Sequence, residues 1–169
     1  GFPVFAAFMR SAALDWFLQR PGIPSRLQQE TAMRYAPSHS EYQSVQSLSA
    51  AELLEYFLIR IAETEEVWGL NRNGDWFRQE QAGQSVVSFW PYKQYASDAA
   101  LEQWHDCTPH GMSLEHFLFP ALPQLIAEDV QVDIMPTADR PGCRITPHRL
   151  LDILVEMQHA RKYRLDADG

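Results

Sequence analysis

The sequence predicts an α+β fold in which a mainly antiparallel sheet of about four strands is covered by three or more helices. Amphipathic stretches with helical spacing alternate with short segments rich in β-branched and aromatic residues. Turn-forming residues, including Asn73-Gly74, separate the strand-like segments. The chain has 169 residues, of which 46% are hydrophobic, so it is long and apolar enough to bury a core. We therefore expect one α/β domain, preceded by a helical arm.

The first 36 residues are expected to form this N-terminal helical arm. Apolar residues share one face at helical spacing: Phe5, Phe8, Met9, Ala12 and Trp16. Pro21-Gly22 ends the first helix, and a second is predicted before Pro37. Both helices are too apolar to stay uncovered, so they are predicted to pack on the main domain or on a second subunit. The serine-rich residues 37–48 are interpreted as a linker to a single domain over residues 49–164.

The domain is expected to open with a helix at Ser49. Ser49 and Glu52 have the spacing of a capping box, in which each side chain bonds the backbone N–H of the other residue. An apolar stripe then runs to about Ala62 and consists of Leu54, Phe57, Leu58 and Ile61. Strands are predicted over 66–70, 75–78 and 85–89, with an Asn73-Gly74 turn that makes the first two antiparallel.

The second half of the domain is predicted to alternate helices and loops around one further strand. Trp90-Pro91 leads into a helix that carries Tyr92, Tyr95, Ala96 and Ala99. Residues 104–112 are interpreted as a loop, and Ser113 as the cap of a helix that Pro120 ends. Alternating apolar residues predict a strand over 130–134, followed by a loop over 137–145. Thr146-Pro147 is typical of the start of a last helix.

Charge and composition restrict the possible partners and location. The chain carries 22 acidic and 14 basic residues, a net charge of −8, and such a surface repels a phosphate backbone. We therefore expect no nucleic-acid partner. Two cysteines do not form a disulfide framework, which favours a reducing, cytoplasmic location. No run of about 18 apolar residues is present, so no membrane span is expected.

Short motifs follow one another in a fixed order through residues 46–163. After an amphipathic helix come Glu66-Val67-Trp68-Gly69-Leu70, Phe89-Trp90-Pro91-Tyr92 with Tyr95-Ala96, Trp104 with Asp106-Cys107, Ser113-Leu114-Glu115-His116-Phe117-Leu118, Leu122-Pro123, Ile134-Met135-Pro136-Thr137, and Leu150-Leu151. This order resembles the bacterial domain of unknown function 2750 family. The resemblance implies a small soluble bacterial α/β protein and assigns no catalytic residue. Residues 1–45 and Pro120 depart from the family pattern.

Aromatic residues around the predicted strand-to-helix junction are candidates for a ligand pocket. Trp90, Tyr92 and Trp104 would form its walls, and Asp106 would supply a polar group. The alternative is that the tryptophans are core residues, with Asp106 capping a loop or accepting a bond from an indole.

The cluster of His105, Cys107 and His110 is a weak candidate for metal binding. Structural zinc sites use four ligands at recurrent spacings, which this cluster lacks, so surface histidines beside a small buried cysteine are the alternative. A Cys107 nucleophile would need a base and an orienting group within reach, and His105 and Asp106 are only sequence neighbours. We expect no catalytic residues, no metal and no cofactor.

The sequence favours a non-enzymatic interaction or regulatory module that forms a homodimer, or binds another protein, through residues 1–36. Two alternatives stay open. One is a small-ligand-binding protein or enzyme that uses the aromatic pocket. The other is an immunity-type protein that neutralises a basic toxin, for which association would be sensitive to salt.

Overall fold

A computed structural model describes residues 36–101, 104–137 and 140–168 of the chain. The elements in chain order are α4 (His39–Val45), α5 (Ala50–Thr64), β1 (Glu66–Arg72), β2 (Asp75–Trp76), β3 (Gln79–Gln81), β4 (Gln84–Phe89), α6 (Lys93–Leu101), β5 (Thr108–Ser113), α7 (Leu114–His116), the wide turn η2 (Phe117–Ala121), α8 (Leu122–Ala127), β6 (Gln131–Ile134), β7 (Cys143–Ile145) and α9 (Pro147–Asp168). The predicted helical arm over 1–36 lies outside the described residues, apart from Ala36.

The strands form two sheets that are joined through β1 and the residue that follows β4. One sheet has the order β2-β1-β5 and is wholly antiparallel, and the other has the order β3-β4-β6-β7. In the second sheet β4 and β6 are parallel, and the other pairs are antiparallel. Trp68 of β1 and Trp90 after β4 exchange two backbone hydrogen bonds of 2.8 Å, which join the sheets. The predicted α+β fold is confirmed, with more strands than expected.

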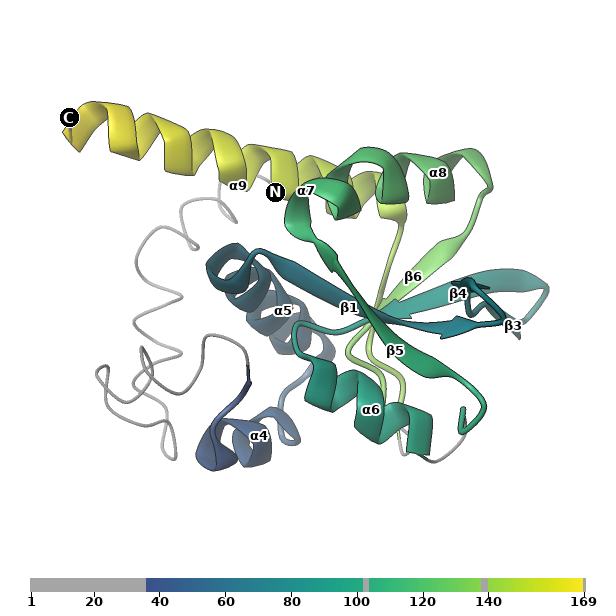
Figure 1. The fold of residues 1–169 in the computed structure, drawn as a ribbon. Helices are drawn as coiled ribbons and strands as arrows, with labels where there is room; N and C mark the ends of the chain where they lie inside the picture. Colours follow the sequence, from purple (N-terminus) through teal and green to yellow (C-terminus); the bar gives the residue numbers. More distant parts are fainter. Residues whose placement is uncertain (1–35, 102–103, 138–139, 169) are drawn as a thin grey trace.

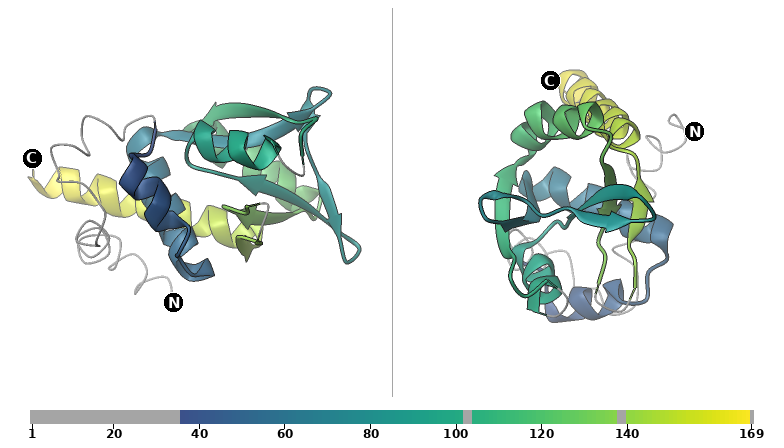
Figure 2. Two further views of the ribbon diagram at one scale, coloured as in Figure 1. Left: turned by 90° about the horizontal axis from the view of Figure 1, so that it is seen from below. Right: turned by 90° about the vertical axis from the view of Figure 1, so that its right-hand side faces the viewer.

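Helices cover the strands on two opposite sides. In Figure 1 helices α7, α8 and α9 lie on one side of the strands, and α6 and α4 lie on the other. The end-on view of Figure 2 shows the strands between these two groups. Helix α5 adds buried apolar residues to the single core cluster, including Leu53, Phe57 and Ile61. None of the described helices is both long enough and apolar enough to cross a membrane.

The turns and helix ends that local sequence patterns predict are present in the structure. Glu52 N–H donates to Ser49 Oγ over 3.3 Å, and Ser49 N–H donates to Glu52 Oε1 over 3.0 Å, so the capping box is present. Asn73 and Gly74 have φ values of 55° and 89°, as a tight turn between β1 and β2 requires. The Thr146 hydroxyl accepts from the Arg149 N–H over 3.2 Å at the start of α9.

The residues interpreted as a linker form a short helix that packs on the core of the described chain. Residues 37–48 contain α4, with Ser38 as its N-cap. Glu41, Val45 and Leu48 are buried. Serine content suggested a linker, but here the Ser38 hydroxyl accepts from the Glu41 N–H and the Ser44 hydroxyl donates to the Ser40 carbonyl. These serines therefore support a short helix, as serines near helix ends often do.

Two segments predicted as loops contain strands. β5 begins inside the predicted loop over 104–112, ends one residue after it, and pairs with β1 from Glu66–Ser113 to Asn71–Thr108. β7 lies within the predicted loop over 137–145 and pairs with β6. Neither segment has a run of β-branched residues, so tertiary pairing outweighs local propensity.

Candidate functional site

A cavity of about 390 Å³ lies between α4, α6 and the segment that joins β6 to β7. Residues of α5 and the end of β4 complete its lining. The cavity thus draws on elements that are far apart in the sequence, from Tyr42 to Arg140, and that the fold brings together.

The walls of the cavity are mainly apolar and aromatic. Leu53, Trp90, Ala99 and Met135 line it. Trp90 is 1% exposed, and its indole N–H donates to the Pro136 carbonyl over 3.0 Å. Because both groups are buried, this bond satisfies the indole and fixes its plane at the wall.

Met135 holds an uncommon backbone conformation beside the cavity. Its φ is 61°, a region that residues other than glycine rarely adopt. The Met135 N–H donates to the Phe89 carbonyl over 3.0 Å, which continues the pairing of β4 with the chain after β6. This conformation is the kind of local strain that tends to occur at functional sites.

Two charged side chains also line the cavity. Asp98 accepts a hydrogen bond from the Tyr42 hydroxyl. Arg140 donates to the Leu48 carbonyl over 2.8 Å and to the Val45 carbonyl over 3.2 Å, at the end of α4. These bonds hold both charged groups in place: Asp98 of α6 is fixed by a side chain of α4, and Arg140 of the β6–β7 segment is fixed by the main chain at and after the end of α4.

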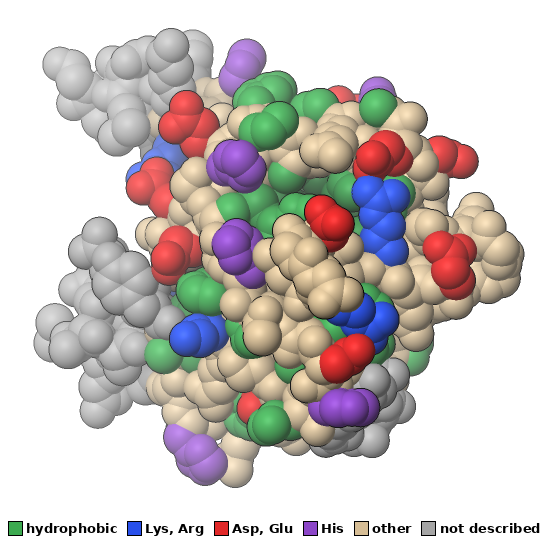
Figure 3. Space-filling model, turned by 45° about the vertical axis from the view of Figure 1, so that its right-hand side comes forward, with side chains coloured by type: hydrophobic (Ala, Val, Ile, Leu, Met, Phe, Trp, Pro, Cys, Tyr) green, Lys and Arg blue, Asp and Glu red, His purple; other side chains and the backbone are tan. Residues whose placement is uncertain are grey.

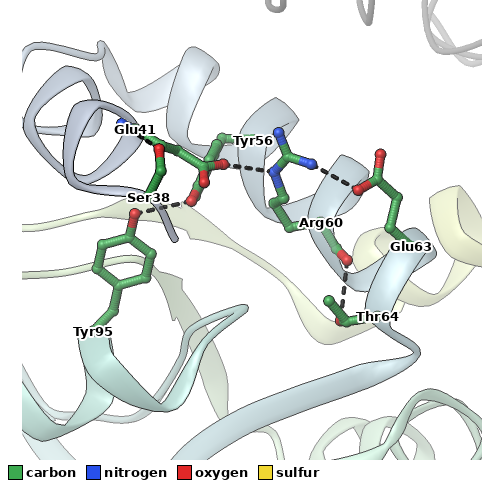
Figure 4. A network of polar contacts seen from close by, with 7 residues as sticks. All are labelled: Ser38, Glu41, Tyr56, Arg60, Glu63, Thr64 and Tyr95. Carbon is green, nitrogen blue, oxygen red and sulfur yellow. Dashed lines mark hydrogen bonds and ion pairs between the residues drawn. The ribbon is translucent and has the colours of Figure 1, made fainter. Parts of the chain in front are cut away.

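A buried polar cluster joins the cavity wall to α5, as Figure 4 shows. Arg60 Nε donates to Glu41 Oε1 over 2.7 Å, and Arg60 also donates to Glu63 Oε2 over 2.7 Å. The hydroxyls of Tyr56 and Tyr95 are 2.9 Å apart. Tyr95 thus belongs both to the cluster and to the cavity lining.

Burial sets the ionisation of this cluster. Burial raises the pKa of Glu41, and the nearby charge of Arg60 offsets only part of that rise. Burial lowers the pKa of Arg60, but several nearby negative groups raise it, and Glu41 has the largest of these raising effects. The pKa of Arg60 is therefore raised overall. Burial also raises the pKa of Tyr56, Tyr92 and Tyr95, so these hydroxyls stay neutral and act as hydrogen-bonding groups.

The four residues predicted as a pocket lie in three different surroundings. Only Trp90 of the four is part of the cavity lining. Trp104 is buried behind it, with the ring centroids 6.3 Å apart. Tyr92 is buried near the Glu41–Arg60 cluster, whose charges act on it. Asp106 has a 51% exposed side chain and pairs with Arg72 over 2.7 Å.

Arg72 connects Asp106 to the aromatic residues. The Arg72 guanidinium lies 4.3 Å from the centre of the Phe77 ring, and Phe77 packs against Trp104 with centroids 5.9 Å apart. The hydrogen bond from Arg72 lowers the pKa of Asp106, so this carboxylate is ionised and already matched by a cation. The structure therefore brings Trp90 and Trp104 together and leaves Asp106 in a surface ion pair.

The weak metal candidates are also separated by their environments. His105 and His110 are exposed and Cys107 is buried. The His110 ring packs edge-on against Trp76, with centroids 5.4 Å apart. Burial raises the pKa of the Cys107 thiol, whose sulfur lies 3.8 Å from Asp106 Oδ1. Across the described ranges, no three His, Cys, Asp or Glu side chains gather as a metal would need.

Tyr42, Asp98, Met135 and Arg140 are cavity residues that the sequence analysis did not identify. Tyr42 and Arg140 fall in segments interpreted as linker and loop, and their contacts span long distances in sequence. One local signal could have identified Asp98: Tyr95 and Asp98 are three residues apart on a helix, so they share a face.

The charged surface gives no separate indication of a binding site on the face that Figure 3 draws. Acidic, basic and histidine side chains are interspersed there, with hydrophobic groups between them. The cavity is the candidate functional site.

Comparison with known proteins gives one family. The model of the family described as "Protein of unknown function (DUF2750)" matches residues 54–154, which include Trp90, Asp98 and Arg140 but not α4. None of the curated proteins compared with this chain matches it. The match covers more than half of the 169 residues. The chain therefore belongs to the DUF2750 family.

Proposed function

We propose that this protein is a binding module that holds a small organic molecule in the cavity between α4 and α6. The observation that carries the proposal is the cavity itself, whose volume of about 390 Å³ falls in the range of small-molecule sites. Such sites combine apolar and aromatic walls with a few fixed polar groups. Trp90 and Met135 supply the first kind of surface, and Asp98 and Arg140 supply the second.

The surroundings of the polar groups favour binding over catalysis. Asp98 is engaged by a tyrosine hydroxyl and Arg140 by two main-chain carbonyls, so each is held in one orientation. Groups held in this way suit recognition of a ligand, because little conformational freedom is lost when the ligand binds.

A regulatory role follows from the position of α4. A ligand in the cavity would contact α4 through Tyr42 and Val45 and α6 through Tyr95. Binding would then stabilise the packing of α4 on the domain by mass action. A bacterial cytoplasmic location and a homodimer formed through residues 1–36 stay predictions of the sequence.

The proposal can be tested through the methyl group of Met135. The chain has five methionines, so a sample with ¹³C-methyl methionine gives few signals, and Met135→Leu identifies the relevant one. We expect members of a small-fragment library to shift the Met135 signal while the signal of Met112, which is buried but does not line the cavity, stays in place.

A blocking variant and its matched control decide where the fragments bind. Gln46 is exposed and lines the cavity, so Gln46→Trp should obstruct it. Gln43 is exposed on the same helix but does not line the cavity, so Gln43→Trp should bind like the wild type. The proposal fails if no fragment moves the Met135 signal, or if Gln46→Trp leaves every such shift unchanged.

A further inference from the structure

We infer that the cavity selects a small zwitterion with an apolar body, whose cationic group binds at Asp98 and whose anionic group binds at Arg140. This inference rests on the proposed function and adds the chemical class of the ligand. An apolar α-amino acid is the simplest compound of this class.

Asp98 supplies the cation-binding end. A carboxylate offers about four acceptor positions, and the described contacts of Asp98 use one of them, for the Tyr42 hydroxyl. No lysine, arginine or histidine of the described chain pairs with Asp98. Asp98 is half-buried, so its negative charge is partly removed from water, and the part of the chain that the structure describes supplies no matching cation.

Aromatic rings beside Asp98 favour the same kind of ligand group. The rings of Tyr42 and Tyr95 stack with centroids 5.5 Å apart and planes within 5°, and both line the cavity. The faces of such rings carry the negative part of the quadrupole and attract cations. An ammonium group at this end would therefore meet a carboxylate and aromatic rings together.

Arg140 supplies the anion-binding end. A guanidinium has five N–H donors, and the side-chain bonds of Arg140 to the Leu48 and Val45 carbonyls use two of them. These carbonyls are neutral, so they orient the side chain without cancelling its charge. The remaining donors of a planar guanidinium match a carboxylate, which they can bind through two parallel hydrogen bonds.

Asp98 and Arg140 line the same cavity, but their side chains do not pair with each other. No ion pair joins Asp98 to Arg140 among the described residues. A ligand with both charges would match each of them, and its apolar part would face Leu53, Ala99 and Met135. A ligand with one charge would leave the other side chain unmatched, which is how a site discriminates against an incomplete ligand.

Matched compound sets test the inference on the full-length wild-type protein. Each set contains an amino acid, the amine that lacks its carboxylate and the acid that lacks its amino group. Three sets, built on leucine, methionine and phenylalanine, vary the apolar body. Isothermal titration calorimetry should show that in at least one set the amino acid binds about tenfold more tightly than either counterpart, since one charge-assisted hydrogen bond contributes about that factor.

Two variants show which side chain binds which charged group of the ligand. Asp98→Asn should weaken the amino acid and the amine about tenfold and leave the acid unchanged. Arg140→Gln should weaken the amino acid and the acid and leave the amine unchanged. Because Arg140 also holds the end of α4, Arg140→Lys is a second variant, which keeps the charge and should show an intermediate loss for the acid.

Control variants make the same chemical changes outside the cavity. Asp75→Asn removes an exposed acidic group on β2, and Arg161→Gln removes an exposed arginine that also donates to a main-chain carbonyl, that of Ala62. Both should bind every compound as the wild type does. Circular dichroism of each variant checks that the fold is retained.

The failure of this inference is distinct from the failure of the proposed function. The inference is overturned if in every set a singly charged compound binds as tightly as the amino acid, or if Asp98→Asn weakens amine and acid alike. It is also overturned if no compound of any set binds while library fragments still move the Met135 signal, an outcome that leaves the cavity function standing. If fragments and compounds both fail to move that signal, the proposed function fails too.

Discussion

The carboxylate of Glu41 and the guanidinium of Arg60 form an ion pair of 2.7 Å that excludes solvent, with their side chains 0% and 1% exposed. Glu41 lies on α4 and Arg60 on α5, so the pair joins the segment first interpreted as a linker to the core of the domain. Because the pair is buried, its two members depend strongly on each other: each would be a costly unmatched charge if the other were removed.

Glu41→Gln is therefore expected to lower the free energy of unfolding by about 3 kcal/mol, because a buried guanidinium then faces a neutral amide. Glu63 also pairs with Arg60, but its side chain is 47% exposed, so Glu63→Gln should cost less than about 1 kcal/mol. Urea unfolding followed by circular dichroism measures both values. Equal losses in the two variants would show that the buried pair contributes no more than the exposed one.

The buried carboxyl group of Asp133 is expected to give the protein an unusual pH dependence of stability. Asp133 is 3% exposed, and its Oδ1 has no hydrogen-bond partner in the described structure. Burial raises the pKa of this carboxyl above the ordinary value of 3.8, against the opposing effects of Arg144 and the Gly142 amide. Since the folded-state pKa is the higher one, folding favours the protonated form, and the stability from this group is lost as pH rises through the folded pKa.

Asp133→Asn is the reference protein for this prediction, because the amide at position 133 does not titrate. The free energy of unfolding of the wild type, relative to that of Asp133→Asn, should increase as the pH falls from neutral toward 3.8 and then become constant. Urea unfolding of both proteins over this range measures the difference. Stability curves that stay parallel throughout would contradict a raised pKa at Asp133.

The parts of the fold that the sequence predicted are those set by local interactions. The capping box of Ser49 and Glu52, the Asn73-Gly74 turn and the Thr146-Pro147 helix start each involve residues within a few positions of one another. Their geometry depends on backbone preferences that a short sequence carries. These predictions are confirmed for that physical reason.

The parts that the sequence did not predict depend on distant partners. β5 has little strand propensity, and it pairs with β1, a partner about 40 positions away, with Gly111 opposite Trp68 and close to that ring. The cavity is similar in this respect: Tyr42 meets Asp98 across 56 positions, and Arg140 meets Leu48 across 92. Periodicity along one segment contains no information about such contacts. Of the four predicted pocket residues, Trp90 is therefore the one that lines the cavity.

Glu65 offers a stabilising substitution at the end of α5. It is the C-cap of this helix and has a left-handed conformation, with φ of 57°, and its side chain is exposed. Glycine adopts this conformation without the steric cost of a Cβ atom. Glu65→Gly should raise the free energy of unfolding by about 0.5–1 kcal/mol, since relief of strain outweighs the greater entropy of the unfolded chain.

Thermal unfolding detects this effect, and Glu63→Gly is the matched control. Glu63 is exposed and lies within α5, where glycine should destabilise the helix by about 1 kcal/mol and also remove the exposed ion pair with Arg60, so both effects have the same sign. Opposite signs for the two substitutions are expected. A loss of stability in Glu65→Gly would mean that the glutamate side chain contributes more than its backbone conformation costs.

Gly142 is the position where the backbone leaves no room for a side chain. A Cβ atom there would lie 1.9 Å from the Ile134 carbonyl oxygen and 2.7 Å from the Pro136 nitrogen. Both atoms are main chain, on β6 and the segment that follows it, so they can move only if the pairing of β6 with β7 changes. Gly142→Ala is expected to lower the free energy of unfolding by about 3 kcal/mol, the upper part of the usual range for overpacking.

Gly111→Ala is the matched comparison, since there the added Cβ atom would meet a side chain. The nearest atom would belong to the Trp68 ring, 2.9 Å away, and Trp68 is only half-buried. That ring can shift, so the expected loss is about 1 kcal/mol. Urea unfolding of the two alanine variants tests the order. If Gly111→Ala proved the more damaging of the two, the close approach of Gly142 to the main chain after β6 would not be what limits this position.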